Sequence, residues 1–419
     1  MQAVEEQQSG LWKRNLPVVW LAIFFGIFSF SFIFPFIPLY IKDLGIDDSA
    51  RAALWSGLVG GAGGLGMFIG APVWGMIGDR YGRKKNMVRA LLGTGIMLAL
   101  TGLSTNVYQL LAFRLVGGFM SGIPPTAMAL IASQSPRSKT SFCIGMLQMA
   151  IFLGSTFGPL AGGYLTSWLG FQRAFFAGGT LLVVMGFVVA AVIREDFKRP
   201  RELETAGPFA QLKLFFEAVT AKQVLVVLVI LFMLQFAPTI MNPVLPLFLA
   251  ELGGEASSSI SSGFAFSVMG FTSAISSLLM PRLAARIGLK SLIVVFAALS
   301  GFCYIPMLVV NATYQAIALV AVFGLLSGAM LGSTSALLSL AVPREQQGRA
   351  FGASQSAVAC AFALGPIVGG AFGSGLGLRS VFVASAVGFL LVALVSMRVI
   401  RLQNDSAQRE DRAGPPTAR

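Results

Sequence analysis

Arg114 is the residue of this 419-residue sequence that most clearly points to chemistry, because it is the only basic residue well inside a long apolar stretch. If that stretch spans a bilayer, a cation there costs about 3 kcal/mol and needs a partner or a function. No Asp or Glu shares its depth, and the nearest acidic residues are Asp43, Asp47 and Asp48. Arg114 therefore either binds substrate or takes part in ion coupling, with Asp43 as the second candidate, or it ties neighbouring helices together through backbone carbonyls.

Other common chemistry is missing from the sequence. There is no histidine, which removes the commonest metal ligand and general base. The three cysteines, Cys143, Cys303 and Cys360, lie in or beside apolar segments without paired spacing, so we interpret them as core residues. No phosphate-binding GxxxxGK[ST] motif occurs. We therefore expect neither an enzyme nor a bound metal or cofactor.

The segment GMIGDRYGRKK at 75–85 combines one carboxylate with glycines and a run of basic residues. The glycines allow a tight turn beside the carboxylate, and a helix that starts on the same side would favour that carboxylate through its partial positive charge. An alternative is a basic loop that only orients the chain, but such a loop needs neither the aspartate nor the glycines. The segment thus indicates more than a topology anchor, and its candidate functional residues are Gly75, Gly78, Asp79, Arg80, Gly82, Arg83 and Lys84.

The elements that position these residues are long apolar segments. Hydrophobic residues make up 56% of the chain, charged residues only 11%, and the mean hydropathy is +0.79. Because about 20 apolar residues span a bilayer core as a helix, this composition predicts an all-α membrane protein. The pattern places twelve transmembrane helices at about 15–41, 52–77, 87–105, 107–132, 141–166, 173–194, 223–250, 258–285, 289–309, 313–341, 350–374 and 378–401.

Lysine and arginine are distributed unevenly over the predicted loops. If the N-terminus is cytoplasmic, 25 of the 30 fall on the cytoplasmic side, and only Lys42, Arg51, Arg173 and Arg379 fall on the other. This positive-inside bias predicts that both termini are cytoplasmic. It also explains the net charge of +13 without nucleic acid as a partner.

The sequence repeats itself at a spacing of about 207 residues. PFIPLYIKDLG at 35–45 corresponds to PVLPLFLAELG at 243–253, and GPLAGG at 158–163 corresponds to GPIVGG at 365–370. Such a repeat indicates a duplicated six-helix unit. The predicted organisation is a cytoplasmic segment at 1–14, six-helix bundles at 15–194 and 223–402, a cytoplasmic interdomain linker at 195–222 and a disordered cytoplasmic tail at 403–419.

Several of these segments carry a family resemblance. The loop at 75–85 resembles the signature loop of the major facilitator superfamily, LLAFRLVGGFMSG at 110–122 is similar to its fourth-helix arginine motif, and GSTFGPLAGG at 154–163 resembles its antiporter motif. The resemblance implies the major facilitator fold, with two pseudo-symmetric six-helix bundles. The start of the chain is similar to that of the bacterial twelve-span multidrug efflux subfamily of drug–proton antiporters. A monomeric, multi-pass protein of the bacterial inner membrane is therefore expected, with the proton gradient as its energy source.

The resemblance also implies roles for particular residues. In the family, the loop aspartate and its neighbouring arginine hold the two bundles together on the cytoplasmic side, and this role passes to Asp79, Arg80 and Arg83. The second copy has Ala285 in place of the aspartate. The antiporter motif predicts a flexible seam between the bundles, although close packing alone would also explain its glycines. The residues of this predicted hinge are Gly154, Gly158, Pro159, Gly162 and Gly163.

Aromatic and amide side chains predict an adaptable apolar substrate cavity, with core packing as the alternative for each residue. The candidates are Phe28, Phe32, Gln148, Phe232, Gln235, Phe236 and Gln355. No carboxylate lies near the middle of a predicted span, which favours neutral or zwitterionic aromatic substrates over permanently cationic ones. We therefore predict export of small amphipathic or aromatic compounds by alternating access in exchange for protons. The alternative is a metabolite or lipid transporter of the same fold with a narrow substrate.

Overall fold

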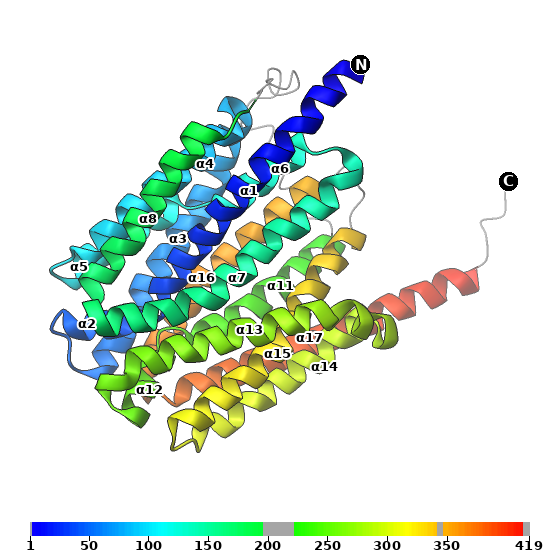
Figure 1. Cartoon of the computed structure of the whole chain (residues 1–419). Coiled ribbons are helices and arrows are strands. Elements are labelled where there is room, and N and C mark those ends of the chain that lie inside the picture. The colour runs from blue at the N-terminus through cyan, green and yellow to red at the C-terminus, as the bar shows by residue number, and fades with distance from the viewer. Residues whose placement is uncertain (1, 196–221, 342–346, 414–419) are drawn as a thin grey trace.

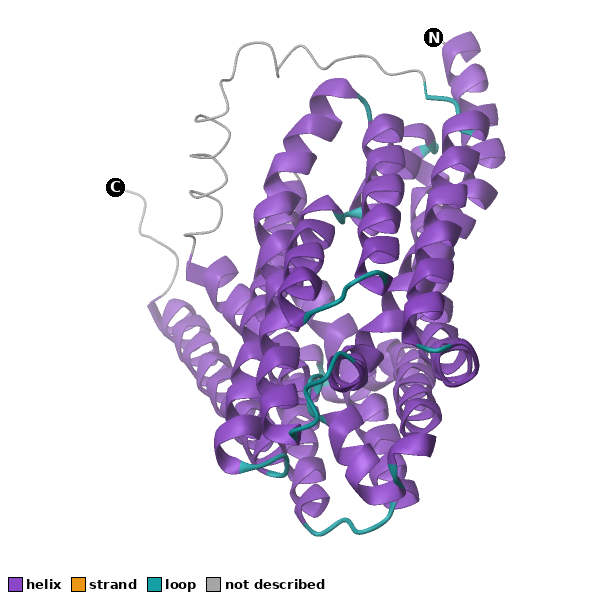
Figure 2. Ribbon diagram, turned by 90° about the vertical axis from the view of Figure 1, so that its left-hand side faces the viewer, coloured by secondary structure: helices purple, strands orange, loops and turns teal. Residues whose placement is uncertain are grey.

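The computed structural model of the chain describes residues 2–195, 222–341 and 347–413, which form helices and short connections only (Figure 2). The first half consists of α1 (Gln2–Ile33), η1 (Phe34–Phe36), α2 (Ile37–Asp43), α3 (Ser49–Tyr81), α4 (Arg83–Gly102), α5 (Val107–Met120), α6 (Ile123–Gln134), α7 (Arg137–Leu169) and α8 (Phe171–Val192). The second half consists of α11 (Lys222–Met241), α12 (Leu245–Gly253), α13 (Glu255–Ile287), α14 (Leu289–Tyr304), η2 (Ile305–Leu308), α15 (Thr313–Ala341), α16 (Gln347–Leu376) and α17 (Ser380–Ala413).

Every predicted span coincides with a helix or with two helices in line, so the predicted all-α membrane fold is confirmed. Eleven spans of the described chain are long and apolar enough to cross a membrane. The remaining predicted span is α4, whose first turns carry Arg83, Lys84, Lys85 and Arg89 and are therefore less apolar. It still has 20 residues, enough for a crossing, and packs along α8.

Three of the described crossings are interrupted near one end or in the middle, and a fourth ends in the 3-10 turn η2. Pro35 and Pro38 accompany the short 3-10 turn between α1 and α2, and Pro243 lies in the turn between α11 and α12. The third interruption, between α5 and α6, contains Gly122 with a φ of 118°. Proline cannot donate a backbone hydrogen bond and glycine tolerates a positive φ, so these residues explain why the helices break where they do.

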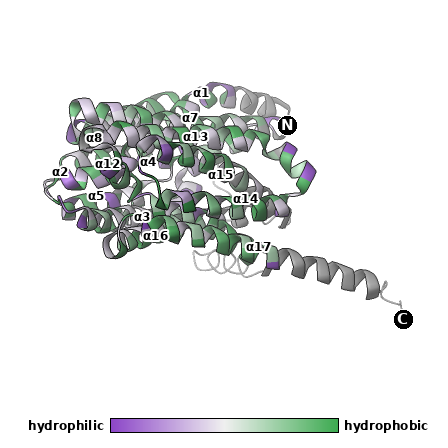
Figure 3. Ribbon diagram, turned by 90° about the horizontal axis from the view of Figure 1, so that it is seen from below, coloured by the Kyte–Doolittle hydropathy of each residue, from purple (hydrophilic) through white to green (hydrophobic). Residues whose placement is uncertain are grey.

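Two ends of the bundle can be distinguished in Figure 1, and both termini leave from the same one. We call this end the terminal face, and it includes the turns at Gly82 and Gly288. The other end is the opposite face, and its turns lie at Gly45, Gly170, Gly254 and Gly377. Between the two faces the helices consist mostly of apolar residues (Figure 3). Many large apolar side chains there are exposed on the surface, including Leu278 and Phe187. This is the surface expected of helices that face lipid.

The same helix pairs pack together in both halves. In the first half the main pairs are α1–α7, α4–α8 and α3–α5, and in the second half they are α11–α16, α14–α17 and α13–α15. The two halves meet through α3 against α16 and through α7 against α13, which are again equivalent pairs. A duplicated six-helix unit would produce this pattern.

Two parts of the predicted organisation need comment. Residues 196–221, which make up most of the predicted linker at 195–222, lie outside the described residues. The predicted disordered tail begins at 403, but α17 continues as a helix to Ala413. The rest of the predicted tail, residues 414–419, lies outside the described residues.

The glycines of the predicted hinge on α7 fall into two groups. Gly154, Gly158 and Gly162 face α1 of their own half, where a Cβ atom added to Gly158 would lie 2.6 Å from the carbonyl oxygen of Phe28. Gly163 instead faces α13 of the other half, where an added Cβ atom would lie 2.7 Å from the carbonyl oxygen of Ser259. Close backbone packing of helices in membranes depends on such small residues.

The equivalent motif on α16 is divided in the same way. Gly365 and Gly369 face α11 of the second half, whereas Pro366 and Gly370 face Gly57 on α3 of the first half. In both copies of GPxxGG, the first two glycines contact a helix of their own half. The proline and the final glycine contact a helix of the other half. All of these inter-half contacts lie toward the opposite face, and we call them the seam.

Replacement of Gly163 by valine is expected to force the seam apart, because the new side chain meets backbone atoms of α13. We expect a destabilisation of about 1–3 kcal/mol, in the range found for overpacking. The control is Gly145→Val on the same helix, where an added Cβ atom meets nothing within 4 Å. The thermal unfolding midpoint of both variants is measured in detergent. Unfolding is monitored through the reaction of the buried Cys143 thiol with a labelling reagent. Equal midpoints for the two variants would contradict the assignment of Gly163 to the seam.

Candidate functional site

The site is built around the interruption between α5 and α6. Helix α5 ends at Met120, Ser121 is extended, and Gly122 adopts a left-handed conformation. Pro124 and Pro125 follow in the first turn of α6, where a missing backbone donor does no harm. The sequence Ser-Gly-Ile-Pro-Pro thus ends one helix and starts the next within the same crossing.

Arg89 of α4 satisfies the carbonyl groups that this interruption leaves free. Its Nη1 atom donates to the carbonyl oxygens of Met120, at 2.5 Å, and Ser121, at 3.3 Å. Its guanidinium lies 3.7 Å from the centre of the Trp74 ring, and the Trp74 Nε1 atom donates to the carbonyl oxygen of Phe119 at 2.7 Å. A cation at a helix C-terminus is favoured by the helix dipole. The sequence analysis counted Arg89 only among the topological charges, and the one signal for its role was the nearby Gly-Ile-Pro-Pro break.

Arg114, on α5 above this break, has a different environment. Its guanidinium carbon lies 5.8 Å from the centre of the Phe30 ring and 6.0 Å from that of Phe34. Its Nε atom is buried without a hydrogen-bond partner, and within the described residues no hydrogen bond or ion pair of Arg114 is found. Two cation–π contacts contribute about 0.5–2 kcal/mol each, against the cost of placing a cation in the membrane.

Arg114 lines a partly open cavity. Its walls come mainly from helices α1, α3, α4 and α5 of the first half, and Phe362 of α16 contributes from the second half. Aromatic rings and thioethers provide most of the side-chain surface, and glycines of α3 and α5 provide flat backbone. The side chains and glycines that matter for its chemistry are Phe30, Phe34, Gly63, Gly64, Met67, Thr94, Met97, Phe113, Arg114, Gly117 and Phe362.

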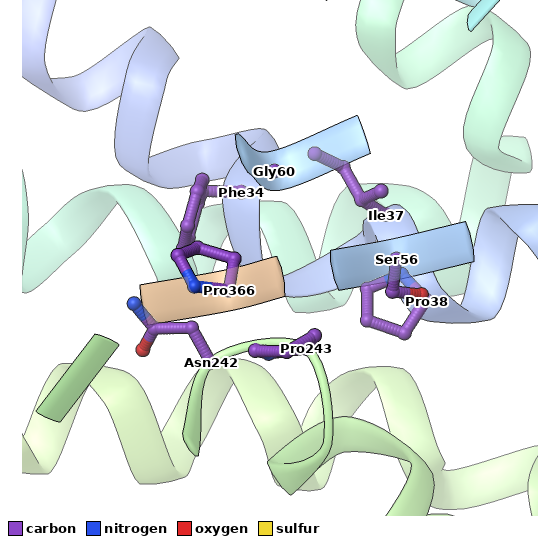
Figure 4. A pocket seen from close by; sticks show the side chains of 8 residues that line it. All are labelled: Phe34, Ile37, Pro38, Ser56, Gly60, Asn242, Pro243 and Pro366. Atoms are coloured by element: carbon purple, nitrogen blue, oxygen red, sulfur yellow. The ribbon is translucent and has the colours of Figure 1, made fainter. Parts of the chain in front are cut away.

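A second, smaller cavity lies beside it, where the interruptions of the first and seventh crossings meet (Figure 4). Phe34, Ile37, Pro38, Ser56 and Gly60 line it from the first half, and Asn242, Pro243 and Pro366 line it from the second. Phe34 and Gly60 line both cavities, so the two are neighbours. The small cavity belongs to the seam.

The structure does not pair Arg114 with the acidic residues predicted to be nearest. Asp43 is exposed at the end of α2 on the opposite face. Asp48 accepts hydrogen bonds from the backbone N–H groups of Ala50 and Arg51 and so caps α3. Neither residue lines the cavity around Arg114.

The predicted substrate residues occupy other places. Phe32 is buried, and the Phe28–Phe32 face of α1 packs on the glycines of α7 rather than on the Arg114 cavity. The rings of Phe232 and Phe236 stack on each other at 5.3 Å, with Gln235 half-buried on the same helix. Gln148 and Gln355 are exposed. None of the seven lines the cavity around Arg114.

The predicted loop at 75–85 is built as a tight connection on the terminal face. Gly82 has a φ of 105°, which favours glycine, and a Cβ atom on Gly78 would lie 2.8 Å from the Asn86 Nδ2 atom, so the Asn86 side chain would have to shift. Gly75 has open space around it. The Asp79 Oδ1 atom lies 3.7 Å from the Arg83 Nη2 atom, with 56% of the Asp79 side chain exposed.

Around this pair, Arg80 lies over the ring of Tyr81, and Arg83 also donates to the carbonyl oxygen of Ala129 at 2.8 Å. The side chains at the start of α16, residues 347–352, lie outside the described set. The predicted contact of the loop with that helix therefore stays a prediction.

Glu195 is a residue of this loop region that the sequence analysis missed. Its carboxylate accepts hydrogen bonds from the backbone N–H groups of Arg83, at 2.9 Å, and Lys84, at 2.8 Å. Helix α4 begins after Gly82, which has no side chain to cap it, so Glu195 supplies the cap from the end of α8. Nothing in the spacing of the sequence indicates this pairing across 111 residues.

Comparison with known proteins supports the same fold. The sequence model of the Major Facilitator Superfamily matches residues 19–262 and 227–418. A multidrug resistance protein MdtG from Yersinia enterocolitica is 34% identical over 406 residues, which is 96% of this chain and 97% of that protein. The protein of the same name from Escherichia coli is 34% identical over 395 residues, 93% of this chain and 95% of that protein.

Two solved structures show the fold alone, because their sequences are less than 25% identical. The human organic anion transporter MFSD10 (TETRAN) has a TM-score of 0.67 at 19% identity and covers 92% of this chain and 99% of its own. A bacterial homologue of the human lysosomal transporter Spinster, in an inward-facing and occupied conformation, has a TM-score of 0.72 at 17% identity, with 93% and 97% covered. Given the family match over almost the whole chain, this protein belongs to the Major Facilitator Superfamily and is a multi-pass membrane protein.

Proposed function

We propose that this chain is a secondary active transporter that exports small amphipathic or aromatic compounds by alternating access. The observation that carries the proposal is the near full-length similarity to proteins named for multidrug resistance. The aromatic cavity around Arg114 supports it, since a pocket of rings and thioethers can accept varied apolar ligands. A transporter rather than an enzyme also follows from the family.

The seam is the part of the structure that alternating access would open. Within the described residues it joins the halves from the middle of the bundle toward the opposite face, through glycines, prolines and backbone carbonyls of α3, α7, α13 and α16. Near the terminal face, Gly75 on α3 and Gly145 on α7 have no neighbour within 4 Å of an added Cβ atom. The halves are thus packed at one end, which is the arrangement of one of the two states that rocking requires.

The distribution of basic residues supports a cytoplasmic terminal face, in the inner membrane of a bacterium, with both termini inside. With this orientation, the seam closes the outer side and the described structure corresponds to an inward-facing state. Asp79 is then exposed toward the cytoplasm, and its ion pair within the described residues is the local one with Arg83. We propose that Asp79 joins the two halves on the cytoplasmic side in the other state, and that Gly163 and Gly370 then separate from their partners. We also propose that the chain works as a monomer.

The energy source in this proposal is the proton gradient. Proton exchange through the protein itself would need a titratable group, and the Asp and Glu residues of the described spans lie only at span ends, as Asp43, Asp79 and Glu251 do. The alternative, a narrow metabolite or lipid transporter of the same fold, shares the seam and the loop and differs only in the compounds that the cavity accepts.

Transport is tested first in inverted membrane vesicles that contain the protein. With an acidic interior, a fluorescent aromatic dye should accumulate, and a protonophore should abolish the accumulation. A varied dye panel without any gradient-dependent accumulation would contradict multidrug export and leave the narrow-substrate alternative.

Replacement of Asp79 by asparagine should separate stability from transport. The exposed pair with Arg83 contributes at most about 0.5 kcal/mol, so the thermal unfolding midpoint should hardly change. Transport should fall at least about tenfold, because the state joined on the cytoplasmic side loses its charged contact. Asp47→Asn, an exposed acidic residue on the opposite face, is the control. Normal transport by the Asp79 variant would remove the proposed role.

Replacement of Glu195 by alanine should destabilise the protein by about 1–2 kcal/mol, because two backbone N–H groups at the start of α4 lose their acceptor. Glu195→Gln keeps one acceptor oxygen and should lose less. Thermal unfolding in detergent compares the two variants with the unmodified chain. Identical behaviour of all three proteins would show that the cap is not needed.

A further inference from the structure

We propose that Arg114 binds the negatively charged group of the transported compound, so that the substrates of this chain are amphipathic aromatic monoanions. This inference rests on the transport function proposed above and narrows its substrate class. It differs from the sequence-based expectation of neutral or zwitterionic substrates. Three observations carry it: the missing partners of Arg114, the composition of its cavity, and the positions of the acidic residues.

Arg114 lies inside a span and has no oxygen partner, unlike four arginines nearer the span ends. Arg83 donates to the carbonyl oxygen of Ala129, Arg89 donates to that of Met120, and Arg379 donates to those of Leu308 and Val310. Arg51 lies near the Asp48 carboxylate. Within the described residues Arg114 has only the rings of Phe30 and Phe34, and its Nε atom is buried and unpaired. The structural alternative, a tie to backbone carbonyls, is therefore not what the structure shows.

A half-buried arginine whose Nε atom is buried without an acceptor is a site that an anion would complete. Its planar donors match a carboxylate or sulfonate, and such charge-assisted hydrogen bonds are the strong ones. The position is accessible to a ligand because Arg114 forms part of the cavity wall, against the flat backbone of Gly63. One cation without a second charge nearby favours a single negative charge on the ligand.

The rest of the cavity indicates what surrounds that charge. Phe30, Phe34, Phe113 and Phe362 offer aromatic surface, and Met67 and Met97 add polarizable thioethers. Hydroxyl groups are few, and that of Thr101 is already bonded to the carbonyl oxygen of Met97 at 2.8 Å. The ligand that fits therefore has one anionic group and a hydrophobic, preferably aromatic, body.

The acidic residues make a cationic ligand unsuitable in the described spans. Asp43, Asp79 and Glu251 are exposed at the ends of their spans, so no carboxylate faces the cavity. A cationic compound would meet Arg114 without a counter-charge, and like charges repel more strongly between apolar walls than in bulk water.

The inference also explains how the proton gradient is used without a carboxylate in mid-membrane. A monoanion that leaves the negative cytoplasm moves down the electrical part of the gradient. The loaded site is neutral because the anion compensates Arg114, while the empty site is positive and is favoured to face the negative side. The charge that couples transport to the membrane potential is then carried by the substrate.

The test uses the full chain in proteoliposomes with a potential set by valinomycin and a tenfold potassium gradient, without a pH difference. The probes are naphthalene-1-sulfonate, the neutral naphthalene-1-sulfonamide and a naphthyl trimethylammonium cation. With a positive interior, the sulfonate should approach a tenfold accumulation, since a monovalent anion follows the potential set by potassium. The neutral and cationic probes should show no accumulation above protein-free vesicles.

Two variants separate a binding role from a structural one. In the Arg114→Gln variant, sulfonate transport should fall at least about tenfold, and its unfolding midpoint is compared with that of the unmodified chain. The Arg114→Lys variant should retain part of the sulfonate transport because the positive charge remains. Arg51→Gln, exposed on the opposite face, controls for general attraction of anions. Should Arg114→Gln fold poorly, the selectivity of Arg114→Lys between the three probes still decides the question.

The outcomes distinguish this inference from the function on which it rests. Transport of the cation or the sulfonamide by the unmodified chain, but not of the sulfonate, would overturn the anion site and leave export intact. Unchanged sulfonate transport by Arg114→Gln would also overturn it. No transport of any probe, with either a potential or a pH gradient, would contradict the anion site together with the proposed export.

Discussion

Close contact between glycines and the carbonyl oxygens of neighbouring helices is the constraint on which the rest of this structure depends. Inside a bilayer, helices gain little from hiding apolar surface, so they associate by packing closely. Gly158 approaches the carbonyl oxygen of Phe28, and Gly163 approaches that of Ser259, with room for no side chain. Because each carbonyl keeps its own intrahelical hydrogen bond, contacts of the second kind can separate without leaving an unpaired polar group. The same construction therefore holds each half rigid and lets the halves part.

The interruptions of the crossings impose a second requirement. Each interruption leaves backbone carbonyl groups without an intrahelical partner, and these groups need another hydrogen-bond donor. Arg89 supplies it at the end of α5, and Arg379 supplies it after η2. At the start of α4 the roles are reversed, and the Glu195 carboxylate accepts from free N–H groups. Charged side chains near the ends of the crossings thus serve the backbone, which is why a cation that does not, Arg114, stands out so clearly.

The architecture was predictable from the sequence because membrane spans are strong local signals. The twelve spans follow from runs of apolar residues, and the need for glycine at Gly82 follows from the tight turn that its neighbours predict. The duplication follows from a repeat at a spacing of about 207 residues. The GPxxGG motifs were recognised as special, but their division between two neighbours was not. Which side of a helix meets which partner depends on the rotation of the helix, and that is set by the whole bundle.

The candidate site shows this limit most directly. Helix α1 carries phenylalanine on every side. The sequence near Phe28 and Phe32 therefore gave no indication that other phenylalanines face the cavity. In the structure that face packs on α7, while Phe30 and Phe34, two residues further along, face Arg114. Arg89 and Glu195 were missed for a related reason, since their partners are backbone atoms of distant helices and leave no pattern in the sequence.

Phe362 gives the cavity a property that a pocket inside one bundle would lack. It reaches from α16 into a cavity otherwise formed by the first half, and its ring lies 6.5 Å from that of Phe34 in an edge-on contact. When the halves separate, one wall of the cavity leaves with the second half. A compound that touches this wall is therefore bound differently in the two states, and by thermodynamic linkage its size and shape bias which state the protein occupies. A ligand bulky enough to displace Phe362 would stabilise the state that is open on the outside. Such a ligand would be an inhibitor, whereas a substrate must also fit the cavity of the other state.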